Sequence, residues 1–243
     1  MKITIFSNNQ ARHLSLAKEL SQIADEIFFI CEINTIFPGQ VDDFFQKSNL
    51  MKSYFINVIE SQTKIFGDID FLPINVKTLA IKFGDLSNLN KHQLTKALNS
   101  DFYIIFGSSF IKGWLADFLV ANNAINIHIG LSPYYRGSSC NFWALYDNNP
   151  GYVGATIHFL SKGLDSGPIL FHCLPNLVAG DSTFDFTMRS VLVAHKCLVK
   201  SIYNKKLFKF SCSNQDKSKE IRYSKKSDFT DDIVDEFLNR KYS

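Results

Sequence analysis

The fold of this chain is decided by residues 2–33, KITIFSNNQARHLSLAKELSQIADEIFFICEI. Residues 2–7 are a short β-rich run that ends in the polar turn SNNQ, residues 7–10. Residues 11–24 then carry apolar side chains at helical spacing, and residues 26–33 are a second strand. A strand, a helix and a strand in this order predict the opening of a doubly wound, mostly parallel α/β sheet. The first turn has no GxGxxG pattern, so a dinucleotide site is not predicted.

The rest of the chain continues the alternation of strands and helices expected of such a sheet. Its length suits one large domain, which we place at residues 1–204, followed by a polar C-terminal arm at residues 205–243. Residues 183–204 form a helix whose start is marked by Asp181-Ser-Thr, with Asp185 in its first turn. The other expected elements are helices at 42–66, near 91–99, at 111–121 and near 229–240, and strands near 77–82, at 101–106, around 126–128 and at 154–160, 168–174 and 207–210.

Composition narrows the class of protein. A hydrophobic fraction of 46% with 20% charged residues is ordinary for a soluble globular chain, and a net charge of +3 is too small to predict nucleic acid as a partner. No run approaches the roughly 18 apolar residues that a membrane span needs. The five cysteines form no CxxC pair and no metal-type set with histidine, so we expect a cytoplasmic protein without a metal site. The 23 phenylalanines and the expected 207–210 strand favour a homodimer.

Three polar residues indicate the type of reaction. Asn126 and His128 lie two apart at the end of an apolar run, so on a strand their side chains point to the same side. Asp165 follows on a glycine-flanked loop that can bend back towards that strand end. An amide stabilises an oxyanion, an imidazole takes up a proton, and a carboxylate fixes the charge of the imidazole. Taken alone, His128 is typical of a core histidine and Asp165 of a turn, but together they predict acyl transfer without a side-chain nucleophile.

These residues belong to an ordered set of five motifs: Asn126-x-His128, the loop Leu131-Ser-Pro-Tyr-Tyr-Arg136-Gly137, Trp143-Ala144, Gly154-Ala-Thr156 and Asp165-Ser-Gly167. The set resembles the formyltransferases that use N10-formyltetrahydrofolate. The resemblance is strong over residues 101–172 and weaker over residues 1–31. It implies a Rossmann-like formyltransferase fold, N10-formyltetrahydrofolate as co-substrate, and catalysis by the amide, the imidazole and the carboxylate named above.

The resemblance also implies where the two reactants bind. The turn after the 101–106 strand and the loop 160–165 would be two walls of a folate pocket. The first turn, the Tyr-Tyr-Arg loop and the C-terminal arm would face the acceptor, although Arg136 could equally anchor its loop, and core packing is the favoured role for Trp143. The cofactor-binding candidates are Ser108, Ser109, Phe110, Lys112, Leu160, Lys162 and Gly163, and the substrate-binding candidates are Asn9, Arg12, His13, Tyr135, Arg136 and Tyr223.

Within this family the acceptors differ while the formyl chemistry stays. Fewer than forty residues follow the 183–204 helix, which argues against methionyl-tRNA as acceptor, and the first turn differs from the Gly-Ser-rich turn of phosphoribosylglycinamide formyltransferases. Residues 132–143, SPYYRGSSCNFW, look most like sugar-nucleotide N-formyltransferases. We therefore expect transfer to the amine of a nucleotide-linked dideoxyamino sugar, such as a dTDP- or GDP-linked 4-amino-4,6-dideoxyhexose, for surface polysaccharide (O-antigen) biosynthesis.

Four alternatives stay open at this point. Two are the phosphoribosylglycinamide and methionyl-tRNA formyltransferases. The third is a formyltetrahydrofolate hydrolase, although such enzymes usually carry an N-terminal regulatory domain that we do not expect ahead of residue 1. The fourth is a binding module for folate or nucleotide that has no turnover.

Overall fold

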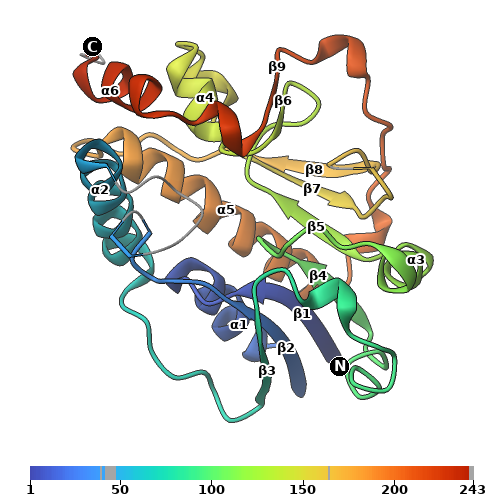
Figure 1. Ribbon diagram of the computed structural model, residues 1–243. Helices are drawn as coiled ribbons and strands as arrows, with labels where there is room; N and C mark the ends of the chain where they lie inside the picture. The colour runs from blue at the N-terminus through green and yellow to red at the C-terminus, as the bar shows by residue number, and fades with distance from the viewer. Residues whose placement is uncertain (39, 42–47, 164, 241–243) are drawn as a thin grey trace.

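The computed structural model describes residues 1–38, 40–41, 48–163 and 165–240. The strands of its main sheet are β1 (Lys2–Asn8), β2 (Glu26–Ile33), β3 (Val76–Lys82), β4 (Phe102–Ile105), β5 (Ile125–His128), β7 (Ala155–Phe159) and β8 (Ile169–Cys173). They form one seven-stranded sheet in the order β3-β2-β1-β4-β5-β7-β8 (Figure 1). β1 to β5 run parallel to one another, whereas β7 pairs antiparallel with both β5 and β8. This mostly parallel sheet confirms the predicted fold class.

Helices cover both faces of the sheet. The helices are α1 (Ala11–Ser21), α2 (Asn49–Phe66), α3 (Gly113–Ala121), α4 (Cys140–Tyr146), α5 (Thr183–Tyr203) and α6 (Asp231–Asn239). Leucines of α1 and α5 share one buried cluster with Ile3 and Ile5 of β1, and Leu115 of α3 shares a second cluster with Phe6 on the opposite face. β1 is therefore buried on both sides, as a central parallel strand should be. The capping box between Ser182 and Asp185 begins α5 where the sequence predicts it.

The helix predicted near residues 91–99 is wrong, because this segment forms a series of turns. The Thr95 hydroxyl donates to the carbonyl oxygens of Lys91 (3.2 Å) and His92 (2.9 Å). Such local side-chain bonds compete with the backbone bonds of a helix. The predicted helix at 42–66 begins in the structure at Asn49, and residues 42–47 lie outside the described residues.

The strand predicted at residues 207–210 is also wrong, since Leu207–Lys209 is a 3₁₀ turn. Leu207 is buried in the core cluster, and the neighbouring ring of Phe208 stacks on Phe102 and Phe159 at centroid distances of 5.6 and 6.2 Å. Both side chains thus turn towards the domain, whereas a strand would place them on opposite sides. The packing of these two adjacent apolar side chains explains why the segment forms a turn and not a strand.

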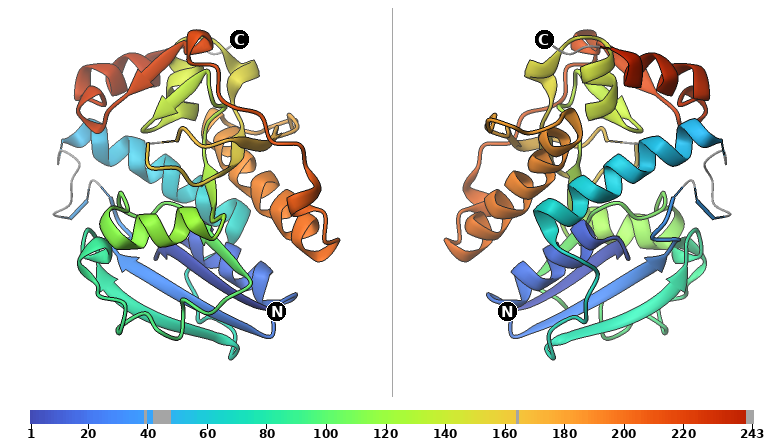
Figure 2. Two further views of the ribbon diagram at one scale, coloured as in Figure 1. Left: turned by 90° about the vertical axis from the view of Figure 1, so that its right-hand side faces the viewer. Right: turned by 90° about the vertical axis from the view of Figure 1, so that its left-hand side faces the viewer.

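The C-terminal arm starts beside the first residues of β4, and its last part, ending in α6, lies beside α2 and α4 (Figures 1 and 2). It contributes strand β9 (Arg222–Ser224), which pairs in parallel with β6 (Tyr135–Gly137) as a separate two-stranded sheet that the sequence did not predict. α6 packs on α2 through an aromatic cluster that includes Phe55, Phe142 and Phe237. A domain boundary at residue 204 stays a prediction.

Candidate active site

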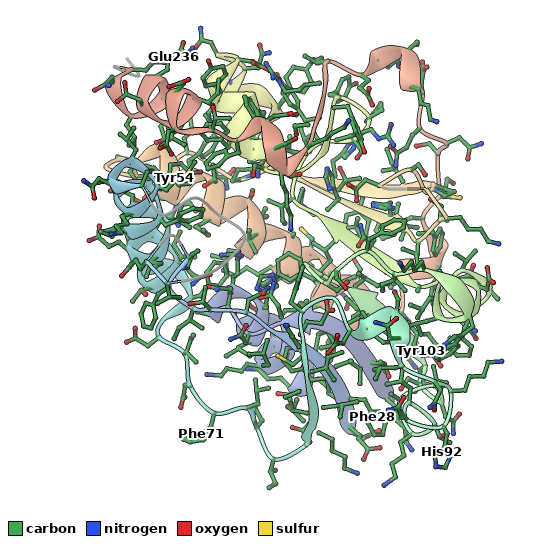
Figure 3. All side chains as sticks on the ribbon, viewed as in Figure 1. Phe28, Tyr54, Phe71, His92, Tyr103 and Glu236 are labelled. Carbon is green, nitrogen blue, oxygen red and sulfur yellow. The ribbon has the colours of Figure 1, made fainter. Side chains whose placement is uncertain are left out.

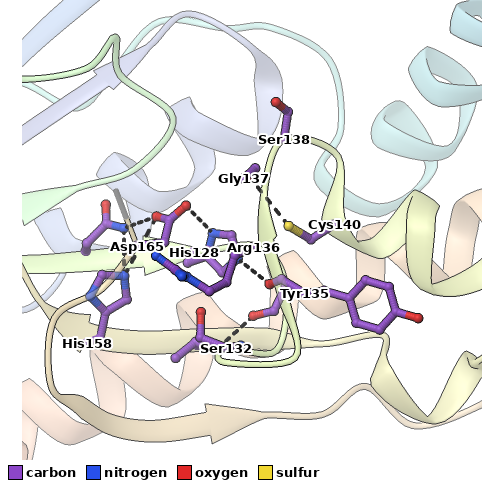
Figure 4. Close-up of polar contacts among 12 residues, drawn as sticks. His128, Ser132, Tyr135, Arg136, Gly137, Ser138, Cys140, His158 and Asp165 are labelled. Carbon is purple, nitrogen blue, oxygen red and sulfur yellow. Dashed lines mark hydrogen bonds and ion pairs between the residues drawn. The ribbon is translucent and has the colours of Figure 1, made fainter. Parts of the chain in front are cut away.

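Asp165 brings the three predicted catalytic side chains together (Figure 4). Its Oδ2 lies 3.3 Å from His128 Nδ1, and its Oδ1 accepts a bond of 3.3 Å from the Asn126 amide. Asn126 and His128 share one side of β5, as the two-residue spacing predicts. Asp165 itself has a φ of 46°, in the left-handed region that aspartate tolerates better than most residues. One carboxylate thus contacts both the Asn126 amide and the His128 imidazole.

His128 is a buried imidazolium. Its Nδ1 faces the Asp165 carboxylate, and its Nε2 lies 3.1 Å from the backbone oxygen of Tyr135. Both neighbours can only accept a hydrogen bond, so both ring nitrogens carry a proton. Burial opposes the charge, but the Asp165 carboxylate, the Cys140 side chain and the Tyr135 carbonyl outweigh it and raise the pKa of His128 to about 10. The ring is therefore a charged donor at neutral pH.

His158 is a further member of the site that the sequence prediction missed. It lies opposite Asn126 in the β5–β7 register, and its Nε2 is 3.0 Å from the Asn126 amide nitrogen. Its Nδ1 lies 2.8 Å from the Phe159 oxygen and therefore carries the proton, which leaves Nε2 as an acceptor. Burial lowers the pKa of His158 to about 4, so the ring stays neutral and fixes the orientation of the Asn126 amide. The sequence did contain a signal for this residue, because His158 is a polar residue inside the apolar run 154–160.

A cavity of about 720 Å³ runs along the carboxyl ends of the central strands and includes these side chains. The Cys140 thiol, next to His128, also lines it and was not predicted. So does Asn8, whose amide donates to the Gly107 oxygen at 2.9 Å and fixes the turn after β4. The predicted residues that line the cavity are Asn126, His128, Asp165, Ser108, Ser109, Phe110, Leu160, Gly163, Arg12 and His13.

Six predicted contacts lie outside the cavity lining, and three of them are Asn9, Lys112 and Lys162. The Asn9 side chain bonds the backbone nitrogen and oxygen of Asn34 and so ties the turn after β1 to the turn after β2. Lys112 precedes α3 and is exposed. Lys162 forms a surface ion pair of 2.8 Å with Asp117. Ser109 does line the cavity, but its N–H and hydroxyl both donate to Glu32, so these donors serve the turn itself.

The Tyr-Tyr-Arg loop and the C-terminal arm contact each other through side-chain interactions. Tyr135 is buried with its hydroxyl bonded to Asp147, so only its backbone oxygen reaches the site. The Arg136 guanidinium pairs with Glu220 at 2.9 Å and lies over the Tyr223 ring at 5.9 Å. The structure therefore places Tyr135, Arg136 and Tyr223 in the contact between loop and arm, away from the cavity. For Arg136 this geometry corresponds to the anchoring alternative.

Arg12 lines the cavity at the end formed by the turn after β1. Its guanidinium donates to Gln62 at 2.6 Å, and within the described part of the chain it pairs with no carboxylate. Burial lowers the pKa of Arg12 to about 10, which still leaves the side chain charged at neutral pH. Arg12 is the second residue of α1, and no side chain caps the N-terminus of this helix. Both features favour an anion at this end of the cavity.

His195 of α5 lies beneath this end of the cavity. Its ring is fully buried against Phe66 and Phe106, at centroid distances of 5.8 and 5.2 Å, and neither ring nitrogen has a partner among the described residues. Burial, with a smaller contribution from Arg12, lowers the pKa of His195 to about 3. The folded protein therefore binds this proton less readily than the unfolded chain, and stability falls as the pH drops below about 6.5.

The His195→Phe protein should be more stable than the wild type, most of all in acid. The phenylalanine ring fits the same aromatic contacts and has no proton to exclude, which is worth about 2 kcal/mol at pH 5 and little from this cause at pH 8. Thermal unfolding of both proteins at pH 5 and pH 8 measures the difference. An equal effect at the two pH values would contradict the assignment of a buried neutral ring.

In residues 1–38, 40–41, 48–163 and 165–240, no three His, Cys, Asp or Glu side chains are grouped so that they could hold a metal ion. No helix of the same residues is both long and apolar enough to cross a membrane.

Part of the chain is similar to a known protein family. Residues 87–202 match the model of the formyl transferase family. Formyltetrahydrofolate deformylase 2 of Arabidopsis thaliana is 30% identical over 124 residues, which are 49% of this chain and 36% of that protein. This chain therefore spans about a third of the length of that curated relative.

Solved structures share the fold. A 4-N formyltransferase from Francisella tularensis is similar over 93% of this chain and 77% of its own, with a TM-score of 0.58 and 19% identity. The N-formyltransferase from Helicobacter canadensis, in complex with folinic acid and dTDP-3-aminofucose, covers 100% of this chain with 74% of its own, at a TM-score of 0.54 and 14% identity. Residues 87–202 thus match the formyl transferase family, and the chain shares the fold of these solved structures.

Proposed function

We propose that this protein transfers the formyl group of N10-formyltetrahydrofolate to the amine of a nucleotide-linked amino sugar. The observation that carries the proposal is the double contact of Asp165 with Asn126 and His128 on the wall of the cavity. The match of residues 87–202 to the formyl transferase family supports the chemistry. The Helicobacter canadensis complex, which holds folinic acid and dTDP-3-aminofucose on the same fold, supports the acceptor class.

The residues around the turn after β4 fit the co-substrate. Residues 108–111 line the cavity on one side and Leu160, Ser161 and Gly163 on the other, and the apolar side chain of Ile105 shares a buried cluster with Ile111 and Leu160. The ring of Phe110, 59% exposed, stands at this wall and is available for stacking. A slot with polar edges and an apolar floor suits a flat heteroaromatic ring such as a pterin.

The site residues supply hydrogen bonds and a charge to the reaction. When bound, N10-formyltetrahydrofolate supplies an electrophilic formyl carbon, which the neutral amine attacks. Asn126 and the charged His128 donate to the developing oxyanion, as preorganised donors do in acyl transfer. Their bonds to Asp165 are long, at 3.3 Å each, so an oxygen can share these protons when a reactant is bound. Asp165 keeps His128 charged and accepts the amine proton, directly or through a water. As the oxyanion collapses, the bond between the formyl carbon and N10 would break, and the proton taken from the amine would pass to N10, so that tetrahydrofolate leaves as a neutral amine.

Holding the amine and the formyl carbon in one cavity supplies part of the rate. The reaction then behaves as a near-unimolecular step, which can lower the barrier by several kcal/mol. No side chain has to form a covalent intermediate on this route. The Cys140 thiol beside His128 therefore needs no catalytic step of its own.

The Arg12→Gln protein should bind the nucleotide sugar less well. Replacing the cation with an amide removes a charged hydrogen bond to a phosphate, which corresponds to a rise of roughly 10- to 100-fold in KM. The KM for the folate should stay unchanged, because Arg12 lies at the acceptor end. Steady-state kinetics with each substrate varied in turn measures both values. Lys18→Gln, on the same helix but in a surface pair with Asp70, is the matched control and should leave both KM values unchanged.

A panel of acceptors tests the proposed function. The purified protein is mixed with N10-formyltetrahydrofolate and with dTDP-, UDP- and GDP-linked amino sugars, glycinamide ribonucleotide or methionyl-tRNA, and products are followed by mass spectrometry. We expect a mass gain of one formyl group on an amino-sugar nucleotide. Formylation of glycinamide ribonucleotide or methionyl-tRNA alone would overturn the acceptor while leaving formyl transfer in place.

Hydrolysis of formyltetrahydrofolate is the second candidate, because a deformylase is among the curated relatives. In that reaction a water takes the place of the amine between Asn126, His128 and Asp165. Rapid release of formate without any acceptor would favour it. Formate release that is slow without acceptor, and is displaced by transfer once acceptor is added, would exclude it.

A further inference from the structure

β3 is an edge strand that nothing in the described chain covers. It pairs with β2 on one side only, and no strand of the described residues lies along its other edge (Figure 1). Residues 77–80 are exposed, although odd and even positions of a strand point to opposite faces of the sheet. Both faces of this strand thus meet solvent, together with its unpaired backbone.

The β2–β3 ladder fixes which backbone groups point outward. The Asn75 oxygen accepts from Ile27 N–H at 2.9 Å, and Phe83 N–H donates to the Ile33 oxygen at 3.3 Å. Odd-numbered residues therefore direct their N–H and C=O groups towards β2, since these groups alternate along a strand. The even-numbered residues from Val76 to Lys82 direct theirs to the free edge.

The edge lacks the usual protection against pairing. The strand VKTLAIK contains no proline, and its register with β2 runs without a bulge from Val76 to Lys82. Its charges are Lys77, whose amine is paired with Glu26 of β2, and Lys82 at the last position. Edge strands that stay single normally carry a proline, a bulge or charged side chains, lysine above all. In β3 the charge of the lysine inside the strand is paired within the sheet, and the second lysine stands at its end. This edge has the features of a pairing surface.

We propose that β3 is the interface of a homodimer, in which the β3 strands of two copies of this chain pair antiparallel about a two-fold axis at Leu79. This register places Val76 opposite Lys82 of the second copy and Thr78 opposite Ala80. The Val76 N–H already donates to the Pro73 oxygen, and the Lys82 oxygen already accepts from Asp85. This register pairs the other outward groups, which are the N–H and C=O of Thr78 and Ala80, the Val76 C=O and the Lys82 N–H. Leu79 lies opposite itself in a pair without backbone hydrogen bonds, where side chains approach most closely.

The side chains of β3 suit a second copy of themselves. In this register Lys77 lies opposite Ile81, and Lys82 lies opposite Val76, so no lysine faces a lysine. Like charges directly opposite would destabilise the pair, whereas an aliphatic residue accommodates the lysine stem. The pairing is isologous, as a closed two-fold dimer requires. The strand is therefore complementary to itself in hydrogen bonds and in charge, which favours a second copy of this chain as its partner.

The connector before β3 supplies further apolar area. One strand pair is small beside a standard interface, which buries roughly 1,600 Å² in total. Ile69, Phe71 and Ile74 are 42%, 94% and 102% exposed, and Figure 3 shows Phe71 projecting from this connector away from the sheet. Leu79, at 38%, is a further exposed apolar side chain of this part of the chain. A dimer through β3 would draw on this apolar area in both copies.

Sedimentation of two matched variants tests the interface. The wild-type protein should sediment as a dimer across about 1 to 100 µM, the range expected for a modest interface. Leu79→Lys, which places two like charges at the two-fold axis, should sediment as a monomer with an unchanged circular dichroism spectrum. Leu177→Lys makes the same change at an apolar residue that is 83% exposed elsewhere, and should remain dimeric. A monomeric wild type, or a dimeric Leu79→Lys, would overturn the proposal.

Cysteine cross-linking tests the register. In a background of Cys212→Ser, which removes the exposed native thiol, Leu79→Cys should form an intermolecular disulfide on mild oxidation. Lys77→Cys alone should not, because its opposite residue is Ile81, but an equal mixture of Lys77→Cys and Ile81→Cys proteins should cross-link. Efficient self-linking of Lys77→Cys would contradict a two-fold axis at Leu79. None of these results depends on the proposed function.

Discussion

The His128→Ala protein is expected to lose about 10³-fold or more in kcat for formyl transfer. The substitution removes a charged donor to the oxyanion, and it also removes the group that holds the Asp165 carboxylate in place. The KM values should change little, because the imidazole acts mainly on the transition state. Single-turnover formyl transfer, followed by mass spectrometry, separates the chemical step from binding.

A second histidine provides the matched control. His172 of β8 bonds the Ser132 oxygen at 2.8 Å and so contacts the same loop, but it does not line the cavity. His172→Ala should keep kcat within a few-fold of the wild type. Circular dichroism and thermal unfolding of both variants show whether the fold is intact. Near-normal transfer by a folded His128→Ala protein would contradict the catalytic role.

The Asp165→Asn protein is expected to lose roughly 10²- to 10⁴-fold in kcat. Asparagine keeps the size of the side chain and tolerates the left-handed backbone at this position, where φ is 46°. The change therefore removes the charge with little strain. Without the carboxylate, the burial of His128 is no longer offset by its main charged neighbour.

The pKa of His128 should fall in this variant. In the wild type the pKa is raised to about 10, so the imidazolium is present across the neutral range and is lost only as the pH rises through about 10. In Asp165→Asn the charged form should be lost at a lower pH, because burial then dominates. A pH titration of the His128 ring by NMR measures the shift. Asp117→Asn, in the surface pair with Lys162, is the control, and an unchanged His128 pKa in Asp165→Asn would contradict the assigned ion pair.

The fold could be predicted largely from local patterns. The 2–33 stretch gives β1, α1 and β2 almost residue for residue, because a buried parallel strand and an amphipathic helix each leave a clear periodicity. The 91–99 segment has a similar apolar spacing, yet it is not helical, since Thr95 bonds the carbonyls that a helix would use. The pairing of β6 with β9 left no local signal, because it joins residues about ninety positions apart in the sequence.

The candidate site could be predicted only in part. The spacing of Asn126 and His128 defines one side of a strand, and the motif order places Asp165 near them, so this group could be found. His158 belongs to the site through the β5–β7 register, which the sequence alone does not fix. Arg136 was an even choice between substrate and anchor, and its partner Glu220 lies in an arm whose path no local pattern predicts.

The central claim is that Asn126, His128 and Asp165 direct a formyl group onto an amine. The most direct test follows ¹³C-labelled formyl from N10-formyltetrahydrofolate in the presence and absence of an amino-sugar nucleotide. We predict that the label appears as a formamide on the sugar amine, that formate forms slowly without the sugar, and that His128→Ala abolishes the transfer. Label that appears only as formate, at the same rate with and without the sugar nucleotide, would contradict the account.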